Sequence, residues 1–266
     1  MRIRLCLGVA AILAISLSAC GGGDNRNITG PGFVGIDDSS ADTAPLLTVE
    51  FVDALGQGTA VILSDPVYDG DIAFDPVSSV FTVTAGATPL FFGVDSYDEH
   101  LPEYRAFLTF PLDGITGQDI VPLAATITYA TVELFITQVS FADTVPTFLD
   151  LVQYDLQNPA LDFSAPVIDY RTLDFLYSDP GNYVLIEVTP LMQTAQDLAL
   201  LDFQIRFSLA GGVPVAGAQG ARPQAASKEA ERTVTPFSIA GKRPARAPRG
   251  AGMAPGAGTD RPTRSR

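Results

Sequence analysis

The chain of 266 residues contains no tryptophan, a single histidine (His100), and only two cysteines, Cys6 and Cys20. One histidine excludes a histidine-rich zinc site. If Cys6 is removed with an N-terminal export signal, one thiol remains and no intrachain disulfide can form. Residues 21–210 also contain no lysine, and they carry four arginines against 27 carboxylates. This acidic balance argues against nucleic acid and anionic polymers as partners of the body of the protein.

Sequence motifs of common enzymes are also missing. The chain has no Gly-x-Ser-x-Gly motif and no glycine-rich phosphate loop after a strand. His100 lies in a polar loop, where a lone histidine is most often solvated. A carboxylate pair for glycoside hydrolysis needs two groups at a defined separation, which abundance alone does not supply. We therefore expect a protein that is not an enzyme.

The first twenty residues have the pattern of a cleaved export signal. Arg2 and Arg4 precede an apolar run over residues 5–16, and Leu17-Ser-Ala-Cys20 follows. A membrane-spanning helix needs about 20 apolar residues, so this run is too short to be one.

The Leu-Ser-Ala-Cys ending resembles the lipobox of bacterial lipoproteins. The resemblance implies a signal peptide over residues 1–19 and a lipid on Cys20 that anchors the protein to the membrane. Residue 21 is glycine rather than the aspartate that resembles an inner-membrane retention signal. The expected location is therefore the bacterial cell envelope, at the outer membrane.

The mature chain divides by composition into three parts. Residues 20–44 are rich in small and polar residues and predict a flexible tether behind the lipidated cysteine. Residues 45–210 have a suitable length for one domain. Residues 211–266 hold ten basic and three acidic residues among many Ala, Gly and Pro. This last part is either a disordered basic low-complexity tail or the product of a shifted reading frame, in which case the natural final strand is missing.

Residues 45–210 follow a period of two, which is typical of half-buried strands. The clearest alternation lies in residues 203–209, 130–137, 183–188 and 47–51. Weaker candidates are residues 61–63, 80–84, 90–94, 106–110 and 148–154. Turn formers separate these runs, so we expect an all-β fold, an antiparallel jelly-roll-like β-sandwich.

One short helix is expected before the last of these strands. Thr189 is the predicted N-cap and Pro190 fits the first helical position. Leu191, Ala195 and Leu198 would then share one face and cover an end of the sandwich.

Five segments carry a resemblance to the DNRLRE-type domain. These are Tyr104–Leu112, Ala125–Ile127, Ala130–Leu134, Val184–Thr189 and Phe203–Phe207. They resemble that family's Arg-x-Phe-Leu-x-Phe strand, its Ile-x-x-Ala-x-Leu strand, its helix and its Leu-Arg strand. The resemblance implies a β-sandwich of the carbohydrate-binding-module kind. The family usually closes with one more strand, where this chain has its basic tail.

Candidate sugar contacts follow from that implication. Sugar rings stack on aromatic faces, and without tryptophan the platform must be tyrosine. The candidate residues are Tyr97, Asp98, His100 and Tyr104. The alternative is that these tyrosines pack against neighbouring strands. For Arg105 and Arg206, two of the few cations in an acidic body, we expect ion pairs that stabilise strand pairing.

No cofactor is required by any motif, but calcium as a structural ion has two candidate sites. Oxygen ligands from loops are what calcium uses. The candidate ligands are Asp65, Asp69 and Asp71 in one group, and Asp95, Asp98 and Glu99 in the other. Neither group has EF-hand spacing, and the alternative is two solvated acidic loops.

These observations predict a cell-envelope lipoprotein that presents a non-catalytic β-sandwich, either binding polysaccharide or serving as a surface structural module. Two alternatives stay open. A polysaccharide-acting enzyme would need two carboxylates facing each other in a cleft. A purely architectural or adhesion protein would show a uniformly polar surface. The sequence does not indicate an oligomeric state.

Overall fold

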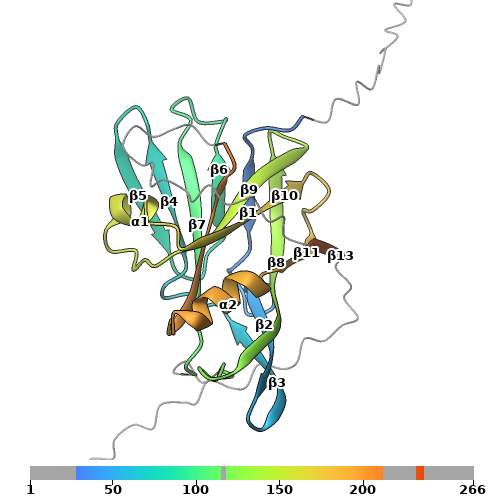
Figure 1. Cartoon of the computed structure of the whole chain (residues 1–266). Helices are drawn as coiled ribbons and strands as arrows, with labels where there is room; N and C mark the ends of the chain where they lie inside the picture. Colours follow the sequence, from blue (N-terminus) through green and yellow to red (C-terminus); the bar gives the residue numbers. More distant parts are fainter. Residues whose placement is uncertain (1–27, 115–117, 212–231, 237–266) are drawn as a thin grey trace, which may run out of the picture.

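The computed structural model describes residues 28–114, 118–211 and 232–236. These residues form a mostly antiparallel β structure with two short helices, which confirms the predicted all-β class (Figure 1). Among them, no helix has the length and apolar character needed to cross a membrane.

Thirteen strands and two helices follow one another along the described residues, and many strands that are neighbours in the sheet are not consecutive in sequence. The strands are β1 (Phe33–Ile36), β2 (Leu46–Asp53), β3 (Gly56–Leu63), β4 (Gly70–Asp75), β5 (Val80–Ala85), β6 (Leu90–Val94), β7 (Glu103–Pro111), β8 (Thr126–Ser140), β9 (Thr144–Leu151), β10 (Asp169–Leu176), β11 (Asn182–Glu187), β12 (Asp202–Leu209) and β13 (Arg232–Pro236). The helices are α1 (Pro159–Phe163) and α2 (Thr189–Asp197).

Strand β8 joins the two layers of the sandwich. Residues 126–135 of β8 pair with β2 and β11, and β3 and β13 extend that layer at its two edges. Residues 136–140 of β8 pair with β1, which leads through β6 to β7, β12, β9 and β10 in the other layer. One continuous sheet therefore curls around on itself, and its inner face encloses the main core (Figure 1).

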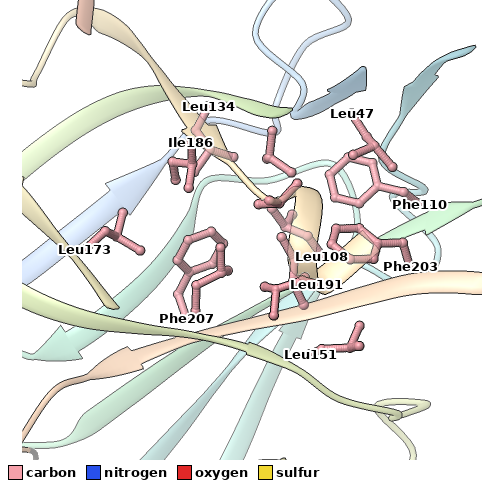
Figure 2. Close-up of a cluster of buried hydrophobic side chains, with 14 of the residues drawn as sticks. Leu47, Leu108, Phe110, Leu134, Leu151, Leu173, Ile186, Leu191, Phe203 and Phe207 are labelled. Atoms are coloured by element: carbon pink, nitrogen blue, oxygen red, sulfur yellow. The ribbon is translucent and has the colours of Figure 1, made fainter. Parts of the chain in front are cut away.

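The main core lies where the two layers face each other. Leu47, Leu134 and Ile186 come from β2, β8 and β11 and are fully buried. They face Leu108 on β7 and Phe203 and Phe207 on β12 (Figure 2). Leu191 of α2 closes this cluster at one end. Each such side chain contributes roughly 1.5–3 kcal/mol by leaving water, so this core supplies stability without any disulfide.

A second apolar cluster covers the other face of β7. Ile72, Phe107 and Tyr154 are buried there together with Phe163, the last residue of α1. The Phe163 ring packs against the rings of Phe74 and Phe81.

Because of this second layer, β12 is buried on both faces rather than half-buried. The prediction that its polar residues face water is therefore wrong, and Gln204, Arg206 and Ser208 are all buried.

Two arginines dock α1 onto the sheet. Arg206 pairs with the buried Asp150 at 2.9 Å and donates from Nη1 to the carbonyls of Phe163 and Ala165. Arg105 pairs with Glu103 at 2.8 Å, and its guanidinium lies 3.9 Å from the centre of the Phe163 ring. Arg206 forms the predicted ion pair between strands, because Asp150 lies opposite it on β9. The prediction is wrong for Arg105, whose partner Glu103 lies on the same strand β7 and therefore does not fix strand pairing. Both arginines donate to the Phe163 carbonyl at the end of α1.

Helix α2 forms where expected but begins differently. Val188 rather than Thr189 is the N-cap, and its hydrocarbon side chain makes no cap hydrogen bond. The Thr189 hydroxyl instead accepts a hydrogen bond from the backbone of Ala130. Leu191 and Ala195 are buried as predicted, whereas Leu198 is 54% exposed. Met192 takes the inner position that was assigned to Leu198.

Strand β1 lies within the segment assigned to the tether by composition. All four of its residues are buried, and it hydrogen-bonds to β6 on one side and β8 on the other. A four-residue run, Phe-Val-Gly-Ile, is too short to stand out by periodicity, and only its two partners make it a central strand.

The close approach of Gly32 and Gly93 permits this pairing. Gly93 has φ +112°, and a Cβ there would lie 2.0 Å from the carbonyl oxygen of Gly32. We expect Gly93→Ala to lower the free energy of unfolding by about 1–3 kcal/mol through strain and overpacking. Chemical denaturation would measure this. Gly56→Ala is the matched control, because Gly56 also has positive φ (+123°) but open space around it, and a loss as large as that of Gly93→Ala would contradict the overpacking.

Residues 232–236 lie in the segment predicted to be a tail and form β13, antiparallel to β11. They extend the edge of the β11 layer. The remainder of the predicted tail, and the signal and lipidation residues up to Cys20, lie outside the described residues.

Candidate functional site

A pair of aromatic rings, the exposed Tyr97 and the half-buried Phe141, lies at the end of the sandwich where β7 begins. Tyr97 is 88% exposed, and its ring meets Phe141 at 4.7 Å between centroids and at 65°. Phe141 follows β8 and has φ 72°, a left-handed conformation that is uncommon for a bulky residue. The tight turn between β8 and β9 thus places an aromatic ring against Tyr97, which limits the freedom of an otherwise solvated side chain.

The loop that carries Tyr97 is tied down by its own aspartates. Asp95 accepts a hydrogen bond from the Tyr97 backbone at 2.9 Å, and Asp98 accepts one from the His100 backbone at 2.9 Å. The Asp95 backbone also donates to the carbonyl of Pro102. These turns fix the loop locally, which lowers the entropy that a bound ligand would have to remove.

His100 makes a contact with a residue that the sequence did not single out. Its Nδ1 lies 3.0 Å from Oδ2 of Asp75, and the Ser78 hydroxyl donates to the same oxygen at 2.6 Å. The Ser78 bond is the main cause that holds the pKa of Asp75 below its ordinary value. In nucleophilic catalysis the imidazole stands between hydroxyl and carboxylate, whereas here the carboxylate stands between them. This order makes a structural bridge between the β4–β5 turn and the Tyr97 loop.

Tyr104 lies partly buried below the aromatic pair. Its ring packs edge-on against Phe33 at 5.2 Å. Burial raises the pKa of the Tyr104 hydroxyl, and the charges of Asp71, Asp95 and Asp98 raise it further. Of the predicted sugar contacts, Tyr97, Asp98 and His100 therefore share one loop, and Tyr104 packs into the sheet beneath it.

This end of the molecule is acidic. Asp95, Asp98 and Glu99 belong to the Tyr97 loop, and Asp143 follows Phe141. The three arginines whose side chains are described lie in ion pairs elsewhere: Arg105 with Glu103, Arg171 with Glu187, and Arg206 with Asp150.

A second exposed tyrosine, Tyr177, lies beside the turn that carries Phe141. The backbone of Tyr177 donates to the carbonyl of Asp143, and the Tyr177 side chain is 69% exposed. The patch defined by Tyr97, Phe141 and Tyr177 is here called the aromatic end.

The six predicted calcium ligands do not converge. Asp95 and Asp98 hold their own turns, and the Glu99 side chain is 92% exposed. Asp65 likewise accepts a hydrogen bond from the Val67 backbone within its own turn. Among the described residues, no group of three or more His, Cys, Asp or Glu side chains is arranged to hold a metal ion.

Asp69 and Asp71 differ from the other four because they are buried. Asp69 accepts a hydrogen bond from the Thr109 backbone at 2.7 Å, and Asp71 accepts one from the Phe91 backbone at 3.1 Å.

Phe141 and Asp75 have no signal in the sequence that marks them. Each is brought to the aromatic end by strand pairing between segments about 25 to 45 residues apart along the chain.

The chain matches no protein family model, no curated protein and no solved structure. The resemblance to the DNRLRE-type domain therefore stays a prediction.

Proposed function

We propose that the protein is a non-catalytic cell-envelope lipoprotein, anchored through a lipid on Cys20, whose aromatic end binds polysaccharide. The observation that carries the proposal is the Tyr97 ring, 88% exposed and held edge-on by Phe141. Exposed aromatic side chains that gather at one end of a domain, as Tyr97 and Tyr177 do, are typical of a surface that a ligand covers.

The surroundings suit a sugar. One face of a pyranose ring is apolar and packs on an aromatic face, while its hydroxyls need hydrogen-bond acceptors. Asp95, Asp98 and Asp143 supply carboxylate oxygens around the aromatic end. Since the loop is tied down before binding, less conformational entropy is lost when the ligand arrives.

The charge selects among polysaccharides. The aromatic end carries several carboxylates, and the three arginines whose side chains are described form ion pairs elsewhere. This negative charge repels uronic acids and sulfated sugars. The proposed ligand is therefore a neutral polysaccharide.

Substitution of Tyr97 tests this function. We expect Tyr97→Ala to weaken binding of neutral oligosaccharides about tenfold or more, because truncating a central aromatic contact typically costs at least about 1.4 kcal/mol. A glycan array would select the oligosaccharide, and calorimetry would measure its Kd. Tyr68→Ala is the matched control, since Tyr68 is 47% exposed in the β3–β4 connection, beside the opposite end of β7.

Two outcomes would argue against the proposal. In one, the wild type binds none of the neutral glycans. In the other, the Tyr97 and Tyr68 variants bind a glycan as tightly as the wild type does.

A further inference from the structure

Two buried carboxyl groups meet at the opposite end of the sandwich, away from the aromatic end. Asp38 follows β1 and is 3% exposed, and Asp69 precedes β4 and is fully buried. Ser64, which follows β3, is 4% exposed and lies close enough to both carboxyls for its hydroxyl to affect them. Oxygen atoms from three separate chain segments therefore lie close together in the interior of the protein.

The carboxyl and hydroxyl oxygens at this place lie near one another, but only one of them has a well-formed hydrogen bond. Asp69 uses Oδ1 to accept the Thr109 backbone at 2.7 Å. Its Oδ2, Oδ2 of Asp38 and the Ser64 hydroxyl oxygen are all buried without a hydrogen bond of ordinary geometry. A buried polar atom left unsatisfied costs about 1–3 kcal/mol, and more when it is charged, so three together need an explanation.

Like charges add to that cost. Burial raises the pKa of Asp38 to about 7 and that of Asp69 well above its ordinary value. Acidic neighbours, which include Asp65 in both cases, further disfavour the ionised form of each carboxyl. The described arginine side chains are engaged elsewhere and do not neutralise the pair. Without a cation beside them the two carboxyls keep their protons, and a bound cation would allow both to ionise at neutral pH.

We propose that Asp38, Asp69 and Ser64 bind one calcium ion, which ties together the ends of β1, β3 and β4. Calcium takes six to eight oxygen ligands in flexible geometry. Two carboxylates match its charge, the Ser64 hydroxyl adds a neutral ligand, and water and backbone carbonyls complete the shell. This site shares only Asp69 with the groups predicted from sequence, and it does not depend on sugar binding at the aromatic end.

Thermal melting of the full chain at pH 8, in EDTA or in excess calcium chloride, tests the site. Calcium at a hundredfold excess over Kd is expected to raise the wild-type Tm by about 5–10 °C. Asp38→Asn and Asp69→Asn should abolish that shift. Asp71→Asn should retain it. Asp71 is as buried as Asp69 and likewise has one carboxylate oxygen without a hydrogen bond, but neither Asp38 nor Ser64 is among the groups that act on its carboxyl.

The sign of the change in Tm caused by Asp38→Asn distinguishes a bound calcium ion from a proton shared by the two carboxyls. If calcium binds, the variant melts above the wild type in EDTA, where a buried charge is removed, and below it in calcium. An equal gain in both buffers, or a wild-type Tm that calcium does not move, would overturn the proposal.

Should the Asn variants fail to fold, Ser64→Ala keeps both charges and provides a second test. We expect it to weaken calcium binding severalfold by calorimetry. An unchanged calcium Kd in this variant would remove Ser64 from the site, and no measurable calcium binding to the wild type would overturn the proposal as a whole.

Discussion

Replacing Arg206 with methionine is expected to lower the free energy of unfolding by about 3–5 kcal/mol, the largest effect of a single substitution that we predict. Arg206 is 3% exposed and its partner Asp150 is fully buried, so the change leaves a carboxylate in the interior without its arginine. It also removes the donor to the carbonyls of Phe163 and Ala165, which docks α1. Urea denaturation with near-ultraviolet detection would measure the loss.

The double variant Arg206→Met/Asp150→Leu provides the control. Replacing both partners of a buried ion pair with apolar groups is often neutral, so most of the lost stability should return. The interpretation fails if the double variant is no more stable than Arg206→Met. In that event the carbonyl contacts of α1, rather than the buried charge, would dominate the energetics.

In EDTA, the protein is expected to lose stability as the pH rises from about 4 to about 7. Asp38 ionises near 3.8 in the unfolded chain, whereas burial and acidic neighbours raise its pKa to about 7 in the folded protein. Between these values the folded state holds a proton that the unfolded state has released, so the free energy of unfolding falls with pH. Asp38 alone contributes on the order of 3 kcal/mol after allowance for solvent screening.

Asp71 also makes the free energy of unfolding fall as the pH rises, because burial raises its pKa to about 6. Urea denaturation at half-unit steps of pH would measure the profile. Asp38→Asn should flatten it substantially, and Glu99→Gln, at an exposed position, should leave it unchanged. A stability that increases over this range in EDTA would show that the buried carboxyls are ionised in the folded protein.

The two proposed sites place different demands on the sandwich. The aromatic end presents Tyr97 on a loop held by its own turns, so ligand binding needs no change in the core. The Asp38–Asp69 pair lies where three strands end and therefore bears on stability. If both proposals hold, calcium removal should lower the Tm while glycan affinity at temperatures well below the Tm stays unchanged.

Local pattern was enough to predict much of the fold. Strands β2, β8, β11 and β12 were predicted from their alternation of apolar and polar residues, since a strand exposes alternate side chains to opposite faces. The acidic charge of residues 21–210 and the absence of common catalytic motifs were likewise properties of the chain itself. Such features depend on neighbours within a few residues, so the sequence alone determined them.

The tertiary structure decided what remote segments do together. Strand β1 is a strand only because β6 and β8 flank it. Strand β12 loses its solvent-facing side because the segment of residues 154–165, which includes α1, contacts Gln204 and Arg206. Tyr97 meets Phe141 at one end of the sandwich, and Asp38 meets Asp69 at the other, because strand pairing brings separate loops together at each end. Periodicity reports which face of a strand is buried but not which segment lies opposite, because pairing energy depends on the whole set of strands rather than on any one of them.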